Sequence, residues 1–160
     1  MAVGQSNNVV AIVQARMGSS RLKGKVLKTL PFSNELTILD HVVLRAAHSN
    51  SINSVIVATS DLATDDPIEE LCLKNNYNIF RGDEDDVLDR YIHASKMLSK
   101  DDCIIRLTAD NPFIDFEIID FCVKKHFQLS SDYSYSNSLP LGMNIELIRK
   151  STLDKVGNLA

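Results

Sequence analysis

The sequence lacks several patterns that mark common classes of protein. Its three cysteines, Cys72, Cys103 and Cys122, are odd in number and widely spaced, with neither C-x-x-C metal spacing nor a paired framework. The longest early apolar run is 9–13, and no basic segment precedes it, so we expect neither a signal peptide nor a membrane span. These absences predict reduced core thiols and a cytoplasmic location.

Signatures of several enzyme classes are missing as well. The four histidines show no H-x-x-x-H spacing and no G-x-S-x-G motif occurs, which disfavours zinc chemistry and a nucleophile elbow. The net charge of −4, from 17 basic and 21 acidic residues, gives no reason to expect a nucleic-acid surface. With 160 residues, 44% of them hydrophobic, the chain is long enough for one domain with a full core.

Basic side chains gather in one segment, which is informative in an acidic chain. Residues 9–13 are five apolar residues, four of them β-branched, and predict a buried strand. A loop follows that carries Arg16, Arg21, Lys23 and Lys25 among glycines and serines. Backbone N–H groups, hydroxyls and cations together suit a polyanion, so the segment predicts a phosphate cradle for a triphosphate. The alternative is a solvated basic loop.

Neither of two familiar phosphate motifs fits this loop. The Walker motif needs four residues between its first glycine and Gly-Lys, whereas five separate Gly18 from Gly24, and Val26 stands where Ser or Thr is required. The dinucleotide motif G-x-G-x-x-G is also absent, because Gly18 and Gly24 are six positions apart. The predicted cradle is therefore of another kind.

Strand-like and helix-like segments alternate along the chain. Strands are expected at 9–13, 55–58, 77–80, 103–107, 133–136 and 145–148, and helices at 38–47, 65–74, 85–98 and 116–127. This alternation predicts an α/β fold with a mostly parallel sheet, in which ligands bind at the carboxyl ends of the strands. The residues to inspect are therefore 16–25, 59–61, 81–83 and 108–110.

The run Gln14-Ala15-Arg16-Met17-Gly18-Ser19-Ser20-Arg21-Leu22 with Gly24-Lys25 resembles the nucleotide loop of the cytidylyltransferases that make CMP-sugars. Segments 58–61, 80–91 and 106–115 extend the likeness, which is closest to the branch labelled spore coat polysaccharide biosynthesis protein F. The resemblance implies a three-layer α/β fold with helices on both faces of the sheet, nucleotide-diphospho-sugar transferase-like and Rossmann-like. It also implies that residues 1–160 form a single nucleotidyltransferase domain lacking a C-terminal portion.

The resemblance implies a reaction and its residues. CMP passes from CTP to a hydroxyl of a small-molecule acceptor, often a sugar acid, with release of pyrophosphate and for surface polysaccharide biosynthesis. The implied catalytic residues are Arg16, Lys25 and Asp110, with Asp110 as the Mg²⁺ ligand. The nucleotide-binding residues are Gln14, Ala15, Gly18, Ser19, Ser20, Arg21, Thr59, Arg81 and Thr108. The acceptor-binding residues are Asn137, Asn144 and Glu146.

Two acidic features also have purely structural interpretations. From the residues alone, Asp110 before Asn111-Pro112 is as well explained by a turn as by a magnesium site, and the resemblance favours the metal. The cluster Asp83-Glu84-Asp85-Asp86 could bind a second metal, but its place before an amphipathic segment favours complementing a helix N-terminus.

Two other functions stay open at this stage. A glycosyltransferase with a nucleotide-sugar donor would carry Asp-x-Asp after a strand, and Asp83-Glu84-Asp85 fits those letters only at a helix start. A non-catalytic nucleotide-binding module is the other alternative, because longer family members have a C-terminal segment with a second metal-binding aspartate and, commonly, homodimer contacts. Leu141 and Asn144 replace aspartates of the branch, which predicts a different or more anionic acceptor.

Overall fold

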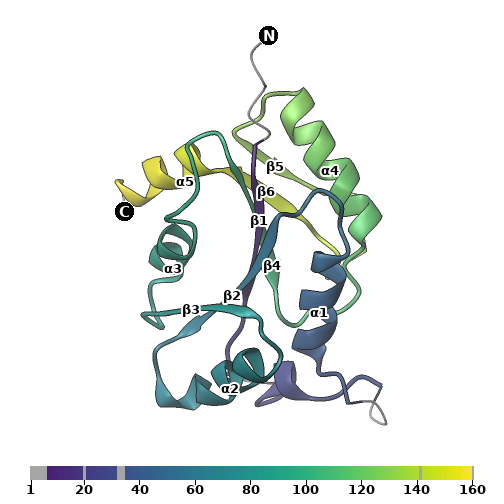
Figure 1. Cartoon of the computed structure of the whole chain (residues 1–160), viewed down its shortest axis with the longest axis vertical. Coiled ribbons are helices and arrows are strands. Elements are labelled where there is room, and N and C mark those ends of the chain that lie inside the picture. The colour runs from purple at the N-terminus through teal and green to yellow at the C-terminus, as the bar shows by residue number, and fades with distance from the viewer. Residues whose placement is uncertain (1–6, 20, 32–34, 141, 160) are drawn as a thin grey trace.

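The computed structural model describes residues 7–19, 21–31, 35–140 and 142–159. A six-stranded sheet crosses the molecule in the order β3-β2-β1-β4-β6-β5 (Figure 1). The first four strands of the chain lie parallel, whereas β6 is antiparallel to both β4 and β5. The predicted mostly parallel sheet is thus confirmed. The strands are β1 Val9–Gln14, β2 Ser54–Ser60, β3 Asn78–Gly82, β4 Cys103–Thr108, β5 Tyr133–Tyr135 and β6 Glu146–Arg149.

Helices connect the strands, as the alternation predicts. They are α1 Ile38–Ala47, α2 Asp66–Lys74, α3 Val87–Ala94, α4 Phe116–Gln128 and α5 Lys150–Gly157, with short 3₁₀ turns η1 Lys25–Leu27 and η2 Ala63–Asp65. Thr37 and Asp40 form a capping box that starts α1, and Asp115 accepts two backbone N–H groups at the start of α4. The expected helix at 85–98 is shorter in the structure, because Ser95 is its C-cap and donates its hydroxyl to the carbonyl of Tyr91.

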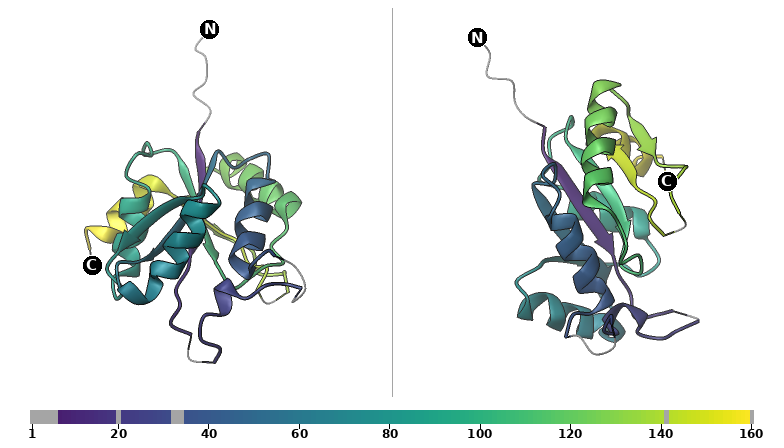
Figure 2. Two further views of the ribbon diagram at one scale, coloured as in Figure 1. Left: turned by 60° about the horizontal axis from the view of Figure 1, so that its bottom comes forward. Right: turned by 90° about the vertical axis from the view of Figure 1, so that its right-hand side faces the viewer.

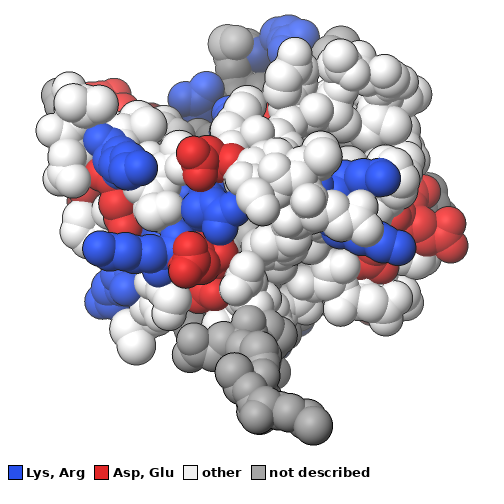
Figure 3. Space-filling view, turned by 90° about the horizontal axis from the view of Figure 1, so that it is seen from above, with Lys and Arg blue, Asp and Glu red and all other residues white. Residues whose placement is uncertain are grey.

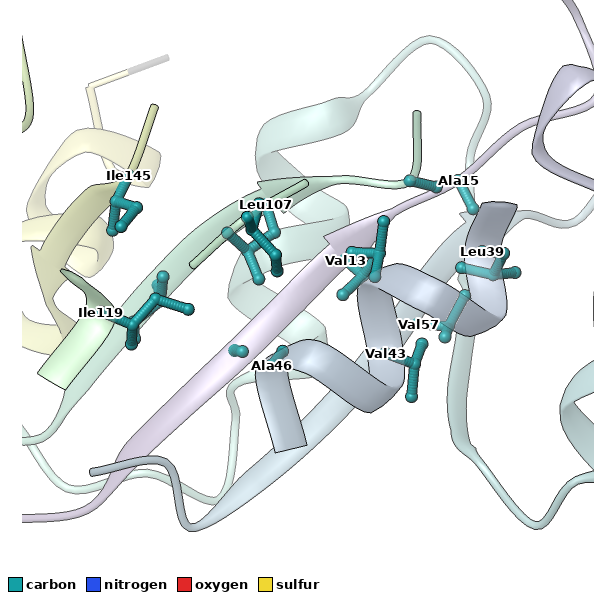
Figure 4. Close-up of a cluster of buried hydrophobic side chains, with 14 of the residues drawn as sticks. Val13, Ala15, Leu39, Val43, Ala46, Val57, Leu107, Ile119 and Ile145 are labelled. Carbon is teal, nitrogen blue, oxygen red and sulfur yellow. The ribbon is translucent and has the colours of Figure 1, made fainter. Parts of the chain in front are cut away.

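Both faces of the sheet are covered, which makes three layers. On one face, side chains of β1, β2, β4 and β6 pack against α1, α2 and α4, as Figure 4 shows for Val13, Val57, Leu107 and their neighbours. On the other face, a smaller cluster joins β1, β2 and β4 to Tyr91 of α3 and Leu153 of α5. Strands with buried residues on both faces need the continuous apolar sequence seen in β1. The implied three-layer arrangement is therefore present.

The acidic run before α3 has a structural role. Asp83 accepts the backbone N–H groups of Asp85 and Asp86, and Asp86 in turn accepts that of Asp89 as the N-cap of α3. These contacts match the helix-start interpretation of the run. Because β3 ends at Gly82, the Asp-x-Asp letters follow a strand directly as well as preceding α3, and the expectation that they stand only at a helix start is wrong.

Other sequence-based expectations concern thiols and charge. The three cysteines are free, and Cys72 and Cys103 are buried. Burial raises the pKa of both thiols to about 12, so they stay protonated at neutral pH. The face shown in Figure 3 carries basic and acidic side chains interspersed, in keeping with the small net charge. Among the described helices, none is both long and apolar enough to cross a membrane.

Candidate active site

The loop after β1 folds back on itself beyond the end of the sheet (Figure 2). The carbonyl of Met17 accepts backbone N–H groups of Ser19 at 2.9 Å and of Gly24 at 3.1 Å. Gly24 adopts a left-handed conformation with φ of 66°, which side-chain-bearing residues disfavour, and it starts η1. This turn returns the chain toward the sheet and places Lys25 at the carboxyl end of β4.

The strand register explains why distant residues meet there. Gln14 ends β1 directly beside Thr108 of β4, so the residues after both strands lie at the same edge. The edge holds a cavity of about 270 Å³. It is lined by Gln14, Arg16, Gly18, Ser19, Arg21, Lys25, Val26, Thr108, Ala109 and Asp110. Eight predicted site residues are thus brought together, and Val26 and Ala109 are additions.

Lys25 and Asp110 form an ion pair across this cavity. The Lys25 Nζ lies 2.7 Å from the Asp110 Oδ2, and the two side chains are 30% and 41% exposed. Burial acts to raise the pKa of Asp110, but hydrogen bonds from Lys25 and Thr108 and the charge of Lys25 outweigh it and lower that pKa. The site therefore offers an ionised carboxylate and an ammonium group that water and ligands can still reach.

A second cavity of about 440 Å³ adjoins the first, and shares Arg21, Lys25, Thr108 and Asp110 with it. Its further lining residues are Arg106, Asn111, Gly142, Asn144 and Glu146. Two of the predicted acceptor-binding residues, Asn144 and Glu146, therefore lie next to the candidate phosphate site. An acceptor in this second cavity would meet a triphosphate in the first.

Several predicted site residues lie elsewhere. Arg81 is bound to α2, with its guanidinium 2.8 Å from Asp66 and 2.5 Å from Glu69, and it does not line either cavity. Asn137 lines a separate, largely apolar cavity beside α4. Ala15 is buried, with its N–H donated to the carbonyl of Ala58. Ser20 and Leu141 lie outside the described residues.

Thr59 is fully buried and donates its hydroxyl to Asp65, a residue that was not predicted from the sequence. Asp65, 3% exposed, accepts the hydroxyls of Thr59 at 3.1 Å and Ser60 at 2.6 Å. It also accepts the backbone N–H of Met17 at 2.7 Å, which ties the β2–α2 connection to the start of the cationic loop. The position of Asp65 soon after Thr59-Ser60 could have indicated a hydrogen-bonded turn. Its contact with Met17, which is distant in the chain, could not be inferred from the sequence.

Two carboxylates at the carboxyl edge of the sheet are candidate ligands of a magnesium ion. Asp110 supplies an ionised carboxylate that lines both cavities, and Glu146 lines the second. The described residues contain no group of three or more side chains able to hold a metal by themselves. These residues fit Mg²⁺, which commonly binds one or two protein carboxylates and completes its shell with phosphates and water.

A doubly covered α/β sheet with a cationic loop and a carboxylate at its carboxyl edge defines a class of nucleotide-binding protein. Comparison with known proteins gives the family. Residues 10–158 match the model of the cytidylyltransferase family, and the chain belongs to this family. It is 41% identical over 154 residues to the spore coat polysaccharide biosynthesis protein SpsF of Bacillus subtilis, covering 96% of this chain and 64% of SpsF.

Solved structures agree on the fold. A cytidylyltransferase from Leptospira borgpetersenii superposes with a TM-score of 0.85 at 32% identity, covering 97% of this chain and 66% of that one. CMP:2-keto-3-deoxy-manno-octonic acid synthetase, solved in complex with CTP, gives a TM-score of 0.72 at 17% identity, over 96% of this chain and 79% of that one. The chain thus spans less than two thirds of the length of SpsF and of the Leptospira protein.

Proposed function

We propose that this chain binds CTP in the first cavity and takes part in transferring CMP to a small acceptor, with release of pyrophosphate. The observation that carries the proposal is the meeting of Arg16, Arg21 and Lys25 with Asp110 in one cavity at the carboxyl edge of the sheet. Phosphoryl transfer needs positioning and charge neutralisation more than covalent chemistry, and these side chains supply both. The family match and the likeness to SpsF support the assignment.

Each residue has a defined part in the proposed reaction. Arg16, Arg21 and Lys25 bind the triphosphate, Gly18 gives it a backbone N–H group, and Ser19, whose N–H is used in the turn, gives it a hydroxyl. Gln14 and Thr108 lie at the strand ends where cytosine would be recognised. The acceptor occupies the second cavity, beside Asn144 and Glu146, so that its hydroxyl oxygen can attack the α-phosphorus while pyrophosphate leaves.

The implied magnesium ion has a place in this scheme. Asp110 would hold it, and when bound it neutralises phosphate charge during transfer. Lys25 would then exchange its contact with Asp110 for one with the triphosphate. We further propose a role in surface polysaccharide synthesis and a cytoplasmic location, with which three free thiols agree. The homodimer implied by the family stays a prediction.

Calorimetric titration with CTP tests the binding half of the proposal. In the presence of Mg²⁺ we expect saturable binding of CTP and weaker binding of ATP, GTP and UTP. Pyrophosphate release on adding candidate acceptors tests the transfer half, and it separates a cytidylyltransferase from a glycosyltransferase or a module that only binds. Failure to bind any nucleoside triphosphate would contradict the proposal.

Replacing Gly18 by alanine tests how closely the nucleotide approaches the loop. A Cβ added at Gly18 meets no atom within 4 Å, so the melting temperature should change by less than about 2 °C. If a phosphate lies against the backbone there, the methyl group collides with the ligand, and CTP affinity falls about tenfold. Unchanged CTP affinity would mean that Gly18 does not contact the nucleotide.

A further inference from the structure

Arg106 has no part in the function proposed so far. It lies on β4, two residues before Thr108, and its side chain is 38% exposed in a strand whose other residues are mostly buried. Arg106 also lines the second cavity, where the acceptor is placed. An arginine in the middle of a nearly buried strand carries a desolvation cost, so its position there calls for a compensating role.

The guanidinium of Arg106 is held in place by Glu146. Its Nη1 donates to the Glu146 Oε1 at 2.7 Å, and the two residues are direct partners in the antiparallel pairing of β4 with β6. Glu146 is in turn paired with Tyr135 of β5, so the strand that carries it is held on both sides. Glu146 is therefore engaged in fixing Arg106.

The charges around the second cavity favour an anion. Arg21, Lys25 and Arg106 give three positive charges there, against two negative charges from Asp110 and Glu146. A guanidinium carries five N–H donors in a planar fork, and the contact with Glu146 uses one of them. Such a fork matches the paired oxygens of a carboxylate or phosphate better than any neutral group.

We propose that Arg106 determines acceptor specificity by binding an anionic group of the acceptor, and that Glu146 is a positioning residue that orients Arg106. This inference rests on the proposed function, because it takes the second cavity as the acceptor site. The anionic group is a carboxylate or a phosphate. It lies at the far side of the acceptor from the hydroxyl that reacts, and its contact with Arg106 aims that hydroxyl at the cavity shared with Lys25 and Asp110.

A purely structural pair is the competing explanation. A cross-strand ion pair stabilises a sheet slightly, and reversing its two charges preserves that contribution. The double variant Arg106→Glu with Glu146→Arg therefore separates the explanations. A structural pair tolerates the exchange, whereas an acceptor anchor does not, because the positive charge has moved to the neighbouring strand.

The test uses the CTP- and Mg²⁺-saturated chain and three small probes. Glycolate, inorganic phosphate and the neutral glycolamide are each titrated while the backbone amide signals of Asn111, Gly142 and Asn144 are followed by NMR. We expect glycolate or phosphate to shift these signals saturably and glycolamide to leave them unchanged. The anion that binds more tightly identifies the anionic group of the acceptor. Arg106→Gln should weaken that probe at least tenfold, Arg106→Lys should restore part of the affinity, and Glu146→Gln should weaken it several-fold.

Controls and contrary outcomes distinguish the two proposals. Arg149→Gln removes an arginine of β6 that pairs with Asp101 and Asp132 outside the cavity, and it should leave probe binding intact. Binding of CTP without any amide shift from either anion would overturn the Arg106 assignment alone, as would normal probe binding in the charge-exchanged variant. Absence of CTP binding in the unmodified chain would overturn the proposed function and this inference with it.

Discussion

Lys25→Met is expected to weaken CTP binding about 100-fold, equivalent to about 3 kcal/mol, because it removes a charge-assisted contact with the triphosphate. Lys25 occupies a turn that Gly24 fixes, so its ammonium group is already placed at the cavity before the nucleotide arrives. The fold should survive, since the Asp110 side chain left without its partner is 41% exposed and can be hydrated. Calorimetric titration and thermal unfolding measure the two effects.

Lys23→Met is the matched control for this experiment. Lys23 is an exposed lysine of the same loop and does not line the cavity. Its replacement removes the same charge and should change CTP affinity by no more than about threefold, through general electrostatic attraction. Equal losses in the two variants would show that the loop acts through its net charge, and a normal affinity in Lys25→Met would remove Lys25 from the phosphate site.

Asp65→Ala is expected to lower the free energy of unfolding by about 3 kcal/mol, or the melting temperature by roughly 6–12 °C. The buried carboxylate accepts bonds from Met17, Thr59 and Ser60, and its removal leaves those donors without their acceptor. The loop start also loses its tether, so CTP affinity should fall beyond what the remaining folded fraction explains. Chemical unfolding and nucleotide titration of the same variant give both numbers.

The same carboxylate gives a pH signature. Burial acts to raise the pKa of Asp65, but hydrogen bonds from Ser60, Met17 and Thr59 outweigh it and hold the pKa below that of an ordinary aspartate. A carboxyl with a lowered pKa stabilises the fold above its unfolded pKa and loses that contribution as pH falls through the folded pKa. The stability gap between the unmodified chain and Asp65→Asn should therefore narrow below about pH 4.

Asp61→Ala is the control for this pair of effects. Asp61 is exposed and directly follows β2, the strand that carries Thr59 and Ser60. Removing its carboxylate should lower the free energy of unfolding by less than about 0.5 kcal/mol. If Asp65→Ala unfolded at the same denaturant concentration as the unmodified chain, the hydrogen bonds to the Asp65 carboxylate would contribute no net stability. A stability gap independent of pH would place the effect of Asp65 in packing rather than in charge.

Most residues that line the first cavity could be selected from the sequence, because they lie close together in the chain. Six of them fall between Gln14 and Lys25 in the sequence, and the rule that ligands bind at strand ends adds Thr108 and Asp110 without any knowledge of packing. The same rule selected Arg81, which in the structure lies within β3 and forms ion pairs with two acids of α2. A local pattern cannot report such a competing partner, since the pairing depends on how α2 packs.

The second cavity was harder to foresee for a related reason. Glu146 was selected as an acceptor residue, but its partner Arg106 becomes visible only when β6 is known to pair with β4 in antiparallel register. That register depends on how the chain returns from β5 to β6, which no spacing rule specifies. Asn137 lies on the same return loop, and the structure directs it to a different cavity. Secondary structure and the parallel part of the sheet were therefore predictable, whereas the antiparallel pairing of β6 was not.

The strand order has a consequence for how the protein is made. Because β6 lies between β4 and β5, the outer edge of β4 has no sheet partner until residues 146–149 have left the ribosome. During synthesis β4 therefore presents an open, apolar edge, the kind of surface that promotes aggregation and recruits chaperones. When β6 docks, it closes this edge and brings Glu146 to Arg106 in the same event. Completion of the nascent sheet and assembly of the second cavity are thus one step of folding.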